Sequence, residues 1–178
     1  MANIAGQIQE YAKNWMNQVA QGPADSVIER SKYKLAVKLL TRFVGQAIPF
    51  TTRNGFEIVD FGPGYVKATI PLKPNKNHFN AMYAGALYTV AEIPGGVLSL
   101  LNFDKAFYPV LAEMTMRYLK PATSDVTVEF KLSKAELKRI QGEAKEQGRS
   151  NFTLEGEIKD AEGQIVATST AYYQVRMK

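Results

Sequence analysis

The sequence predicts an α+β fold, in which an antiparallel sheet of about six strands wraps around one long central helix. Residues 83–101 are almost wholly apolar and of helical length, whereas the segments on either side alternate between apolar and polar residues as strands do. A flat sheet would leave half of a single helix exposed to water. The sheet is therefore expected to curl around the helix, and two additional helices are expected before it.

The composition limits the classes of protein to which the chain can belong. Its 178 residues are expected to form one domain, with residues 1–50 as a helical extension and residues 51–178 as the core. A net charge of +5, made of scattered and interleaved charges, does not indicate nucleic-acid binding. With no cysteine and one histidine, disulfides and a metal site are not expected. We expect a cytoplasmic protein without a membrane span.

The two additional helices are expected at about residues 4–19 and 26–47. Gly22-Pro23 ends the first, and Ser26 with Glu29 forms a capping box that opens the second. The second helix also carries four basic residues on what is expected to be its polar face: Arg30, Lys34, Lys38 and Arg42. Such a face is usually a solvated surface, and less often a surface for a membrane or a partner.

Strands are predicted where the apolar residues recur with a period of two. They cover residues 56–61, 65–70, 107–119, 126–132, 152–158 and 164–176. Gly62-Pro63-Gly64 forms a turn between the first two strands, and Ser133 with Glu136 begins a short polar helix. The strand at 107–119 is expected to place four residues on one face: Ala112, Met114, Met116 and Tyr118.

The central helix contains one ionisable acid, Glu92, between Tyr83 and Leu101. Burying an unpaired carboxylate is costly, and packing alone gives no reason to place one in an apolar helix. Glu92 therefore reaches water, pairs with a neighbour such as Arg117, or has a chemical function. Pro94 lacks the N–H of a helix interior, so we expect a kink just after Glu92.

Three features occur together around this helix. Asn77-His78 stand before it, Glu92 lies within it, and residues 118–122 end the strand at 107–119 with Tyr-Leu-Lys-Pro-Ala. With these features, over about residues 35–177, the chain resembles the hotdog-fold thioesterases, in particular a bacterial family of unassigned function within the PaaI-like branch. The resemblance implies a hotdog fold and an acyl-CoA thioesterase that needs no cofactor, coenzyme A being part of the substrate.

The resemblance also implies the catalytic residues. In PaaI-like enzymes an Asn stands fifteen residues before the helix acid, as Asn77 stands before Glu92. The backbone N–H eight residues before the acid binds the oxyanion; that residue is Ala84 here, beside Gly85. Glu92 would act on water or directly on the carbonyl, and Asn77 would hold the thioester or orient the water.

Substrate contacts are expected from the loop, the helix and the strand at 107–119. The residues are His78, Met82, Tyr83, Tyr88, Met114 and Met116, with His78 bracing the loop rather than catalysing. The phosphates of coenzyme A would meet lysines, and the candidates are Lys73, Lys76, Lys105 and Lys120. Because an open strand edge invites pairing, we also expect a homodimer or a dimer of dimers, joined along the strand at 107–119.

Two other functions stay open at this point. The same fold could bind acyl-CoA or a lipid without catalysis, with Glu92 merely paired. Alternatively, the N-terminal helices could be the working surface of an interaction protein.

The chain also departs from the family pattern at two places. It has Tyr83-Ala84-Gly85 where better-known relatives have His-Gly-Gly, and Gly96 where some carry a hydroxyl. The acyl group, its chain length and the pathway are not predicted.

Overall fold

The computed structural model describes residues 10, 14 and 27–177, with side chains from residue 30 onward in the main segment. The helix expected at 4–19 lies outside the described residues, apart from Glu10 and Asn14. The described elements, in chain order, are α2 (Val27–Ala47), α3 (Pro49–Arg53), β1 (Glu57–Gly62), β2 (Tyr65–Ile70), the 3₁₀ turn η1 (Lys73–Asn75), α4 (Ala84–Asn102), β3 (Phe107–Tyr118), β4 (Val126–Lys131), α5 (Lys134–Gln147), β5 (Arg149–Lys159) and β6 (Ile165–Met177).

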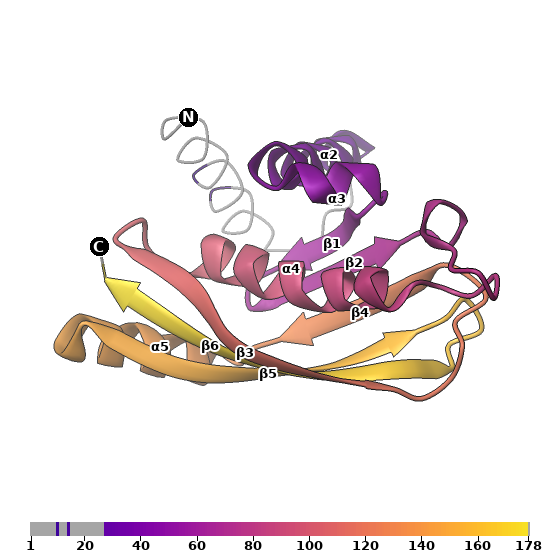
Figure 1. The fold of residues 1–178 in the computed structure, drawn as a ribbon. Helices are drawn as coiled ribbons and strands as arrows, with labels where there is room; N and C mark the ends of the chain where they lie inside the picture. The colour runs from indigo at the N-terminus through magenta and orange to yellow at the C-terminus, as the bar shows by residue number, and fades with distance from the viewer. Residues whose placement is uncertain (1–9, 11–13, 15–26, 178) are drawn as a thin grey trace.

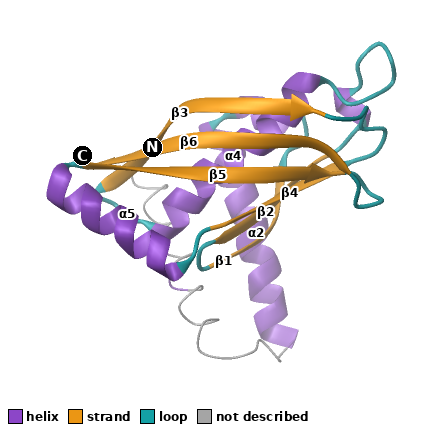
Figure 2. Ribbon diagram, turned by 90° about the horizontal axis from the view of Figure 1, so that it is seen from below, coloured by secondary structure: helices purple, strands orange, loops and turns teal. Residues whose placement is uncertain are grey.

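One antiparallel sheet carries the fold, in the strand order β1-β2-β4-β5-β6-β3. The sheet curls around α4, which lies across it and contacts all the strands from β2 to β6 (Figures 1 and 2). The predicted α+β fold with a wrapped central helix is therefore confirmed. By length and composition α4 could also cross a bilayer. However, 67% of its apolar stretch is buried within the protein, where it forms the centre of the core.

The local signals of the sequence correspond to observed structure. Gly64, in the turn between β1 and β2, has a φ of +70°, a conformation that favours glycine. The Ser133 hydroxyl accepts a hydrogen bond from the N–H of Glu136 at 3.1 Å and so caps α5. That helix has 14 residues and buries Ile140 and Ala144, so it is longer than the short polar helix expected. It packs against β5 and β6.

The prediction for the faces of β3 was partly wrong. A bulge between Leu111 and Glu113 breaks the alternation, because two residues of β3 there oppose one residue of β6. Leu111, Met114 and Met116 pack against the core, whereas Ala112 is exposed. Tyr118 is exposed but lies on the predicted face, because its hydroxyl donates to the Ala84 carbonyl of α4 at 3.5 Å. One inserted residue thus shifts the pattern in the first half of the strand.

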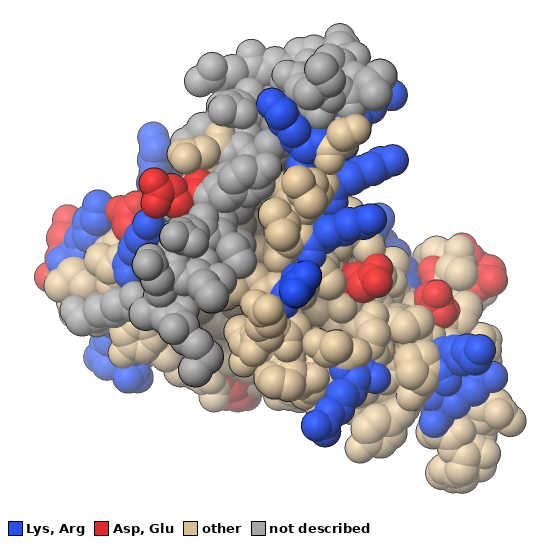
Figure 3. Space-filling view, turned by 90° about the horizontal axis from the view of Figure 1, so that it is seen from above, with Lys and Arg blue, Asp and Glu red and all other residues tan. Residues whose placement is uncertain are grey.

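The outer edge of β1 is covered by α2. The Thr41 hydroxyl donates to the Ile58 carbonyl at 3.2 Å and accepts from the Ile58 N–H at 3.0 Å, so it replaces a neighbouring strand at that residue. The N–H of Phe61 donates to the Tyr33 hydroxyl at 3.3 Å. Lys and Arg side chains project from the surface seen from above (Figure 3).

The opposite edge of the sheet is β3. Within the described part of the chain, no side chain bonds to the free edge of its backbone as Thr41 does for β1. This edge therefore retains the unpaired N–H and C=O groups with which another strand could pair.

Candidate active site

The N-terminus of α4 is held by hydrogen bonds to two neighbouring segments. The N–H of Tyr83 donates to the carbonyl of Asn75 at 2.7 Å, and the N–H of Met82 donates to that of Ala122 at 2.8 Å. The next two N–H groups, of Ala84 and Gly85, have no acceptor among the described residues. They are two of the free donors that begin every helix, at the positive end of its dipole. The sequence prediction named these two residues as the oxyanion donors.

Asn77 organises the loop before α4. Its N–H donates to the Ala81 carbonyl at 2.8 Å, and its Oδ1 accepts from the N–H groups of Phe79 at 2.9 Å and Ala81 at 3.2 Å. The side-chain oxygen is therefore engaged within the loop, and the Nδ2 group has no acceptor in the described residues. His78 is exposed, and its ring lies 3.8 Å from that of Phe79, between centroids.

Asn77, Met82 and Ala84 line one groove of about 390 Å³ at this end of α4. The opposite wall is the segment that ends β3, residues 118–122, and the remaining lining residues are Phe79, Ala81 and Leu87. The structure therefore brings three of the predicted site residues together with the Tyr-Leu-Lys-Pro-Ala segment. Lys120 is the only one of the four candidate lysines among the residues that line it.

Glu92 lies farther along α4 and does not line this groove. From Ala84 to Glu92 is eight residues, or about 12 Å along a helix axis. Gly85, Tyr88, Glu92 and Gly96 form a partly exposed strip along one side of α4, while most other residues of the helix are buried. The acid and the free N–H donors thus share a side of the helix but stand two turns apart.

The Glu92 carboxylate has no ion pair with any described residue. Arg117, the partner considered from sequence, is exposed and alternates with Met116, which faces the core. Burial raises the pKa of Glu92 above the ordinary value of 4.5. The half-buried acid therefore reaches water at the open side of the strip and is not neutralised by a cation.

Tyr173 of β6 is a site residue that sequence reasoning missed. Its hydroxyl donates to the backbone carbonyl of Glu92 at 2.6 Å, and its ring stacks on Phe152 with centroids 5.4 Å apart. Burial raises the pKa of Tyr173 far above its ordinary value, so the hydroxyl stays a neutral donor. The alternation of β6 indicates an inward residue at this position. The sequence contains no signal for a contact with a residue 81 positions earlier.

Gly95 makes this contact possible. A Cβ at this position would lie 2.2 Å from the Tyr173 hydroxyl oxygen, so any side chain would displace the ring. At the neighbouring Gly96, a Cβ would meet nothing within 4 Å. The two glycines therefore differ in role: the first admits Tyr173, and the second leaves open space beside Glu92. Pro94 lies within α4, which continues as a helix to Asn102.

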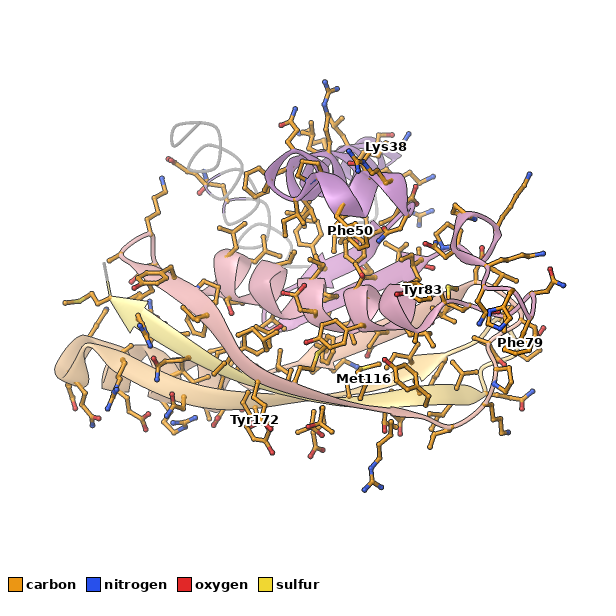
Figure 4. The ribbon with its side chains drawn as sticks, in the orientation of Figure 1. Lys38, Phe50, Phe79, Tyr83, Met116 and Tyr172 are labelled. Atoms are coloured by element: carbon orange, nitrogen blue, oxygen red, sulfur yellow. The ribbon has the colours of Figure 1, made fainter. Side chains whose placement is uncertain are left out.

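The predicted lining residues divide into two groups. Met82, Met114 and Met116 pack against the core, and Met116 lies on β3 beneath α4 (Figure 4). Tyr83 and Tyr88 are 59% and 40% exposed, which leaves two aromatic rings on the surface of an apolar helix. The Tyr83 ring lies over Gly85, where a Cβ would be 2.4 Å from Cε1. Exposed aromatic rings beside an open edge favour a contact with another chain.

The described residues contain no group of three or more His, Cys, Asp or Glu side chains that could hold a metal ion. The polar groups of the site are instead the free N–H donors, one carboxylate, and the amide of Asn77.

The sheet wrapped around α4 defines the hotdog fold, and the solved structures that it matches include proteins assigned as thioesterases. More particularly, the chain belongs to the family described as a domain of unknown function, DUF4442, whose model matches residues 36–175. No curated protein matches the chain in a sequence comparison.

Among the solved structures, the protein of unknown function PA5026 from Pseudomonas aeruginosa is 41% identical, with a TM-score of 0.76 over 79% of this chain and 95% of that chain. A protein from Shewanella oneidensis is 26% identical, with a TM-score of 0.66 over 80% of this chain and 97% of that chain. Both are assigned only provisionally as thioesterases. The thioesterase HI1161 from Haemophilus influenzae, at 18% identity and a TM-score of 0.63 over 79% of this chain and 90% of that chain, shows a shared fold.

Proposed function

We propose that this protein hydrolyses an acyl-CoA thioester and that Glu92 is the catalytic carboxylate. The observation that carries the proposal is the Glu92 side chain itself, a half-buried acid on an apolar helix that has no counter-ion among the described residues. Packing does not explain such a group, and acids in this state are typical of catalytic sites. The provisional assignment of the 41% identical relative as a thioesterase supports the same reaction class.

The proposed reaction is attack of water on the thioester carbonyl. Glu92 removes a proton from the water as its oxygen bonds to the carbonyl carbon, and the carbonyl oxygen becomes negative. The N–H groups of Ala84 and Gly85 stabilise that oxyanion. The C–S bond then breaks, the sulfur takes up the proton, and a carboxylic acid and free coenzyme A leave. Burial raises the pKa of Glu92, which makes its carboxylate a stronger base than an ordinary one.

The separation between these groups suggests that two copies of the chain form the site. In one site, the base must lie about 3 Å from the water and the N–H donors about 3 Å from the oxyanion. Ala84 and Glu92 of one chain, however, stand about 12 Å apart along α4. Pairing of two β3 edges would place the exposed strip of one copy beside the groove of the other. We therefore propose a homodimer joined along β3, in which the donors of one subunit serve the acid of its partner.

Substitution of Glu92 by Gln tests the reaction. We expect kcat to fall by at least about 100-fold, because removal of a general base costs about 10²–10⁴ in rate. Acyl-CoA binding should be retained, because Gln has nearly the same shape. Release of free coenzyme A over a panel of acyl-CoAs measures the effect, and Glu57→Gln, at an exposed position of β1, is the matched control that should leave turnover unchanged.

Two results would point to other conclusions. Unchanged turnover in Glu92→Gln would remove Glu92 from the mechanism. If the parent protein binds acyl-CoAs in calorimetry but releases no coenzyme A from any of them, the protein is a binding module.

Asn77→Ala should reduce turnover by roughly tenfold to a hundredfold. Because its Oδ1 also braces the loop, part of that loss would come from misplacement of Ala84 and Gly85.

A further inference from the structure

The surface of α2 and α3 carries basic side chains that form no ion pair within the described chain. Between Arg30 and Arg53 there are six Lys and Arg residues and no Asp or Glu. All six are exposed, and none of them forms an ion pair with a described residue. In the view from above, blue side chains extend from this part of the surface (Figure 3).

The other long surface helix shows that the chain does balance its charges elsewhere. In α5 the Arg139 guanidinium bonds to Glu136 at 2.5 Å and to Glu143 at 2.7 Å. Basic and acidic residues alternate along that helix, as is usual for a solvated face. The absence of acids from the described part of α2 and α3 beyond residue 29 is therefore a property of this surface and not of the whole protein.

Four of the cations form one row along α2. Arg30, Lys34, Lys38 and Arg42 follow one another at intervals of four residues, so they share a side of the helix over about 18 Å. Like charges at this spacing repel each other and weaken the helix. Lys38 extends from α2 away from the sheet (Figure 4). A row that costs stability is expected where a negatively charged surface binds it.

Exposed apolar side chains adjoin this row. Leu35 and Leu39 are 52% and 38% exposed, and helical geometry places them next to Lys34 and Lys38, with Lys32 on their far side. Two leucines between cations on both sides are the arrangement of a helix that lies in a membrane interface.

The same row borders an apolar groove of about 660 Å³ between α2 and β1. Tyr33, Val37 and Ile58 contribute to its lining, and Glu57 is the single acid there. An amphiphile has an anionic group next to a hydrocarbon part. The cations could bind the anionic group while the apolar surface contacts the hydrocarbon part.

From these observations we propose that the α2 face docks on an anionic lipid bilayer. The row from Arg30 to Arg42 meets the phosphate headgroups, while Leu35 and Leu39 enter the layer between headgroups and acyl chains. A soluble anion would account for the cations but not for the exposed leucines. The surface is separate from Glu92, so the proposal does not depend on the reaction proposed above.

Sedimentation of the full chain with vesicles tests this proposal. We expect binding to vesicles that contain phosphatidylglycerol and little binding to phosphatidylcholine alone, with affinity that falls as salt rises. The variant Lys34→Glu with Lys38→Glu should bind at least about tenfold more weakly, because each cation near an anionic surface adds roughly a factor of five. The matched control, Lys134→Glu with Lys138→Glu, makes the same change of charge on exposed positions of α5 and should retain binding within about threefold of the parent protein.

A third variant separates charge from insertion. Leu35→Ser with Leu39→Ser keeps every cation and should also weaken vesicle binding, by about tenfold. Equal losses in the two charge variants, or equal binding to neutral vesicles, would overturn the proposal. So would displacement by millimolar inorganic phosphate at constant ionic strength, which would indicate a site for a soluble anion. A lower oligomeric mass of the leucine variant in light scattering, without loss of vesicle binding, would assign the surface to contact between copies of this chain.

Discussion

The two edges of the sheet differ in what covers them. At β1 the chain protects its own strand, because Thr41 of α2 supplies both a donor and an acceptor to Ile58. At β3 no described side chain does the same, and exposed aromatic residues lie nearby, among them Tyr118 and Tyr83. An edge strand has unpaired backbone groups on its outer side, and the two edges of this sheet differ in how those groups are met. At β1 they are bonded within the chain, whereas at β3 they are available to a partner.

This difference has a consequence for the site. The strip of α4 that carries Glu92 is the side that the sheet leaves partly uncovered, and α4 also packs on β3. If a second chain pairs with β3, as proposed above, we expect it to cover that strip and to lie next to the carboxylate. The covered edge adds stability alone, whereas the open edge is where we expect stability, assembly and chemistry to be linked.

The largest effect on stability is expected where α4 meets β6. Gly95→Ala places a Cβ against the Tyr173 hydroxyl, so the ring must move and its bond to the Glu92 carbonyl is lost. We expect a loss of about 1–3 kcal/mol in the free energy of unfolding, and a lower kcat. Urea unfolding with the turnover assay measures both.

Gly96→Ala is the control for this change. Its Cβ meets nothing within 4 Å, and Ala favours a helix, so stability should stay the same or rise by up to about 1 kcal/mol. Equal losses of unfolding free energy in the two variants would show that the contact between Gly95 and Tyr173 is not the cause of the loss.

The covered edge should depend on Thr41. Thr41→Val keeps the shape of the side chain but leaves the N–H and the carbonyl of Ile58 without partners. The expected loss is about 1–2 kcal/mol in the free energy of unfolding, from the cost of unpaired buried polar groups. Thermal unfolding should show it, with no change in oligomeric mass. Thr52→Val, at an exposed hydroxyl, should have little effect. A change of mass on Thr41→Val would mean that β1 also takes part in assembly.

The open edge should depend on charge. Glu113→Lys reverses an exposed charge on β3, and in a symmetric dimer the change occurs twice. We expect the dimer dissociation constant to rise by about threefold to tenfold, since cross-strand charge pairs contribute about 0.2–1 kcal/mol each. The same substitution at the covered edge, Glu57→Lys, should leave it unchanged. Sedimentation velocity over a range of concentrations distinguishes the two, and a monomeric parent protein would contradict assembly through β3.

The smallest effect concerns pH. Because burial raises the pKa of Glu92, the folded protein keeps a proton that the unfolded chain has already lost as the pH rises past about 4.5. The free energy of unfolding therefore falls with rising pH, from about 4.5 until the pKa of the folded state has been passed. Glu92→Gln lacks this loss. Relative to the parent protein, it should unfold at a higher temperature at pH 8 than at pH 4. The opposite trend would indicate a cation that stabilises the carboxylate.

Much of the fold could be predicted because its signals are local. The Gly62-Pro63-Gly64 turn, the Ser133 cap and the alternation of the strands each depend on a few neighbouring residues, and the structure contains all three. The bulge at Ala112 could not be predicted in this way, because an extra residue is inserted where β3 must follow the curvature of β6. One such residue was enough to make the predicted face of β3 partly wrong.

For the site, the sequence by itself determined which groups are present and in which order along the chain. It places one acid in an apolar helix, free N–H donors at the start of that helix, and Asn77 before them. Only the tertiary structure decided that Tyr173 holds the Glu92 carbonyl and that Glu92 does not line the groove at Ala84. The physical reason is that helix periodicity and turn chemistry act over a few residues. Contacts between residues 81 positions apart depend on how far the sheet curls around α4.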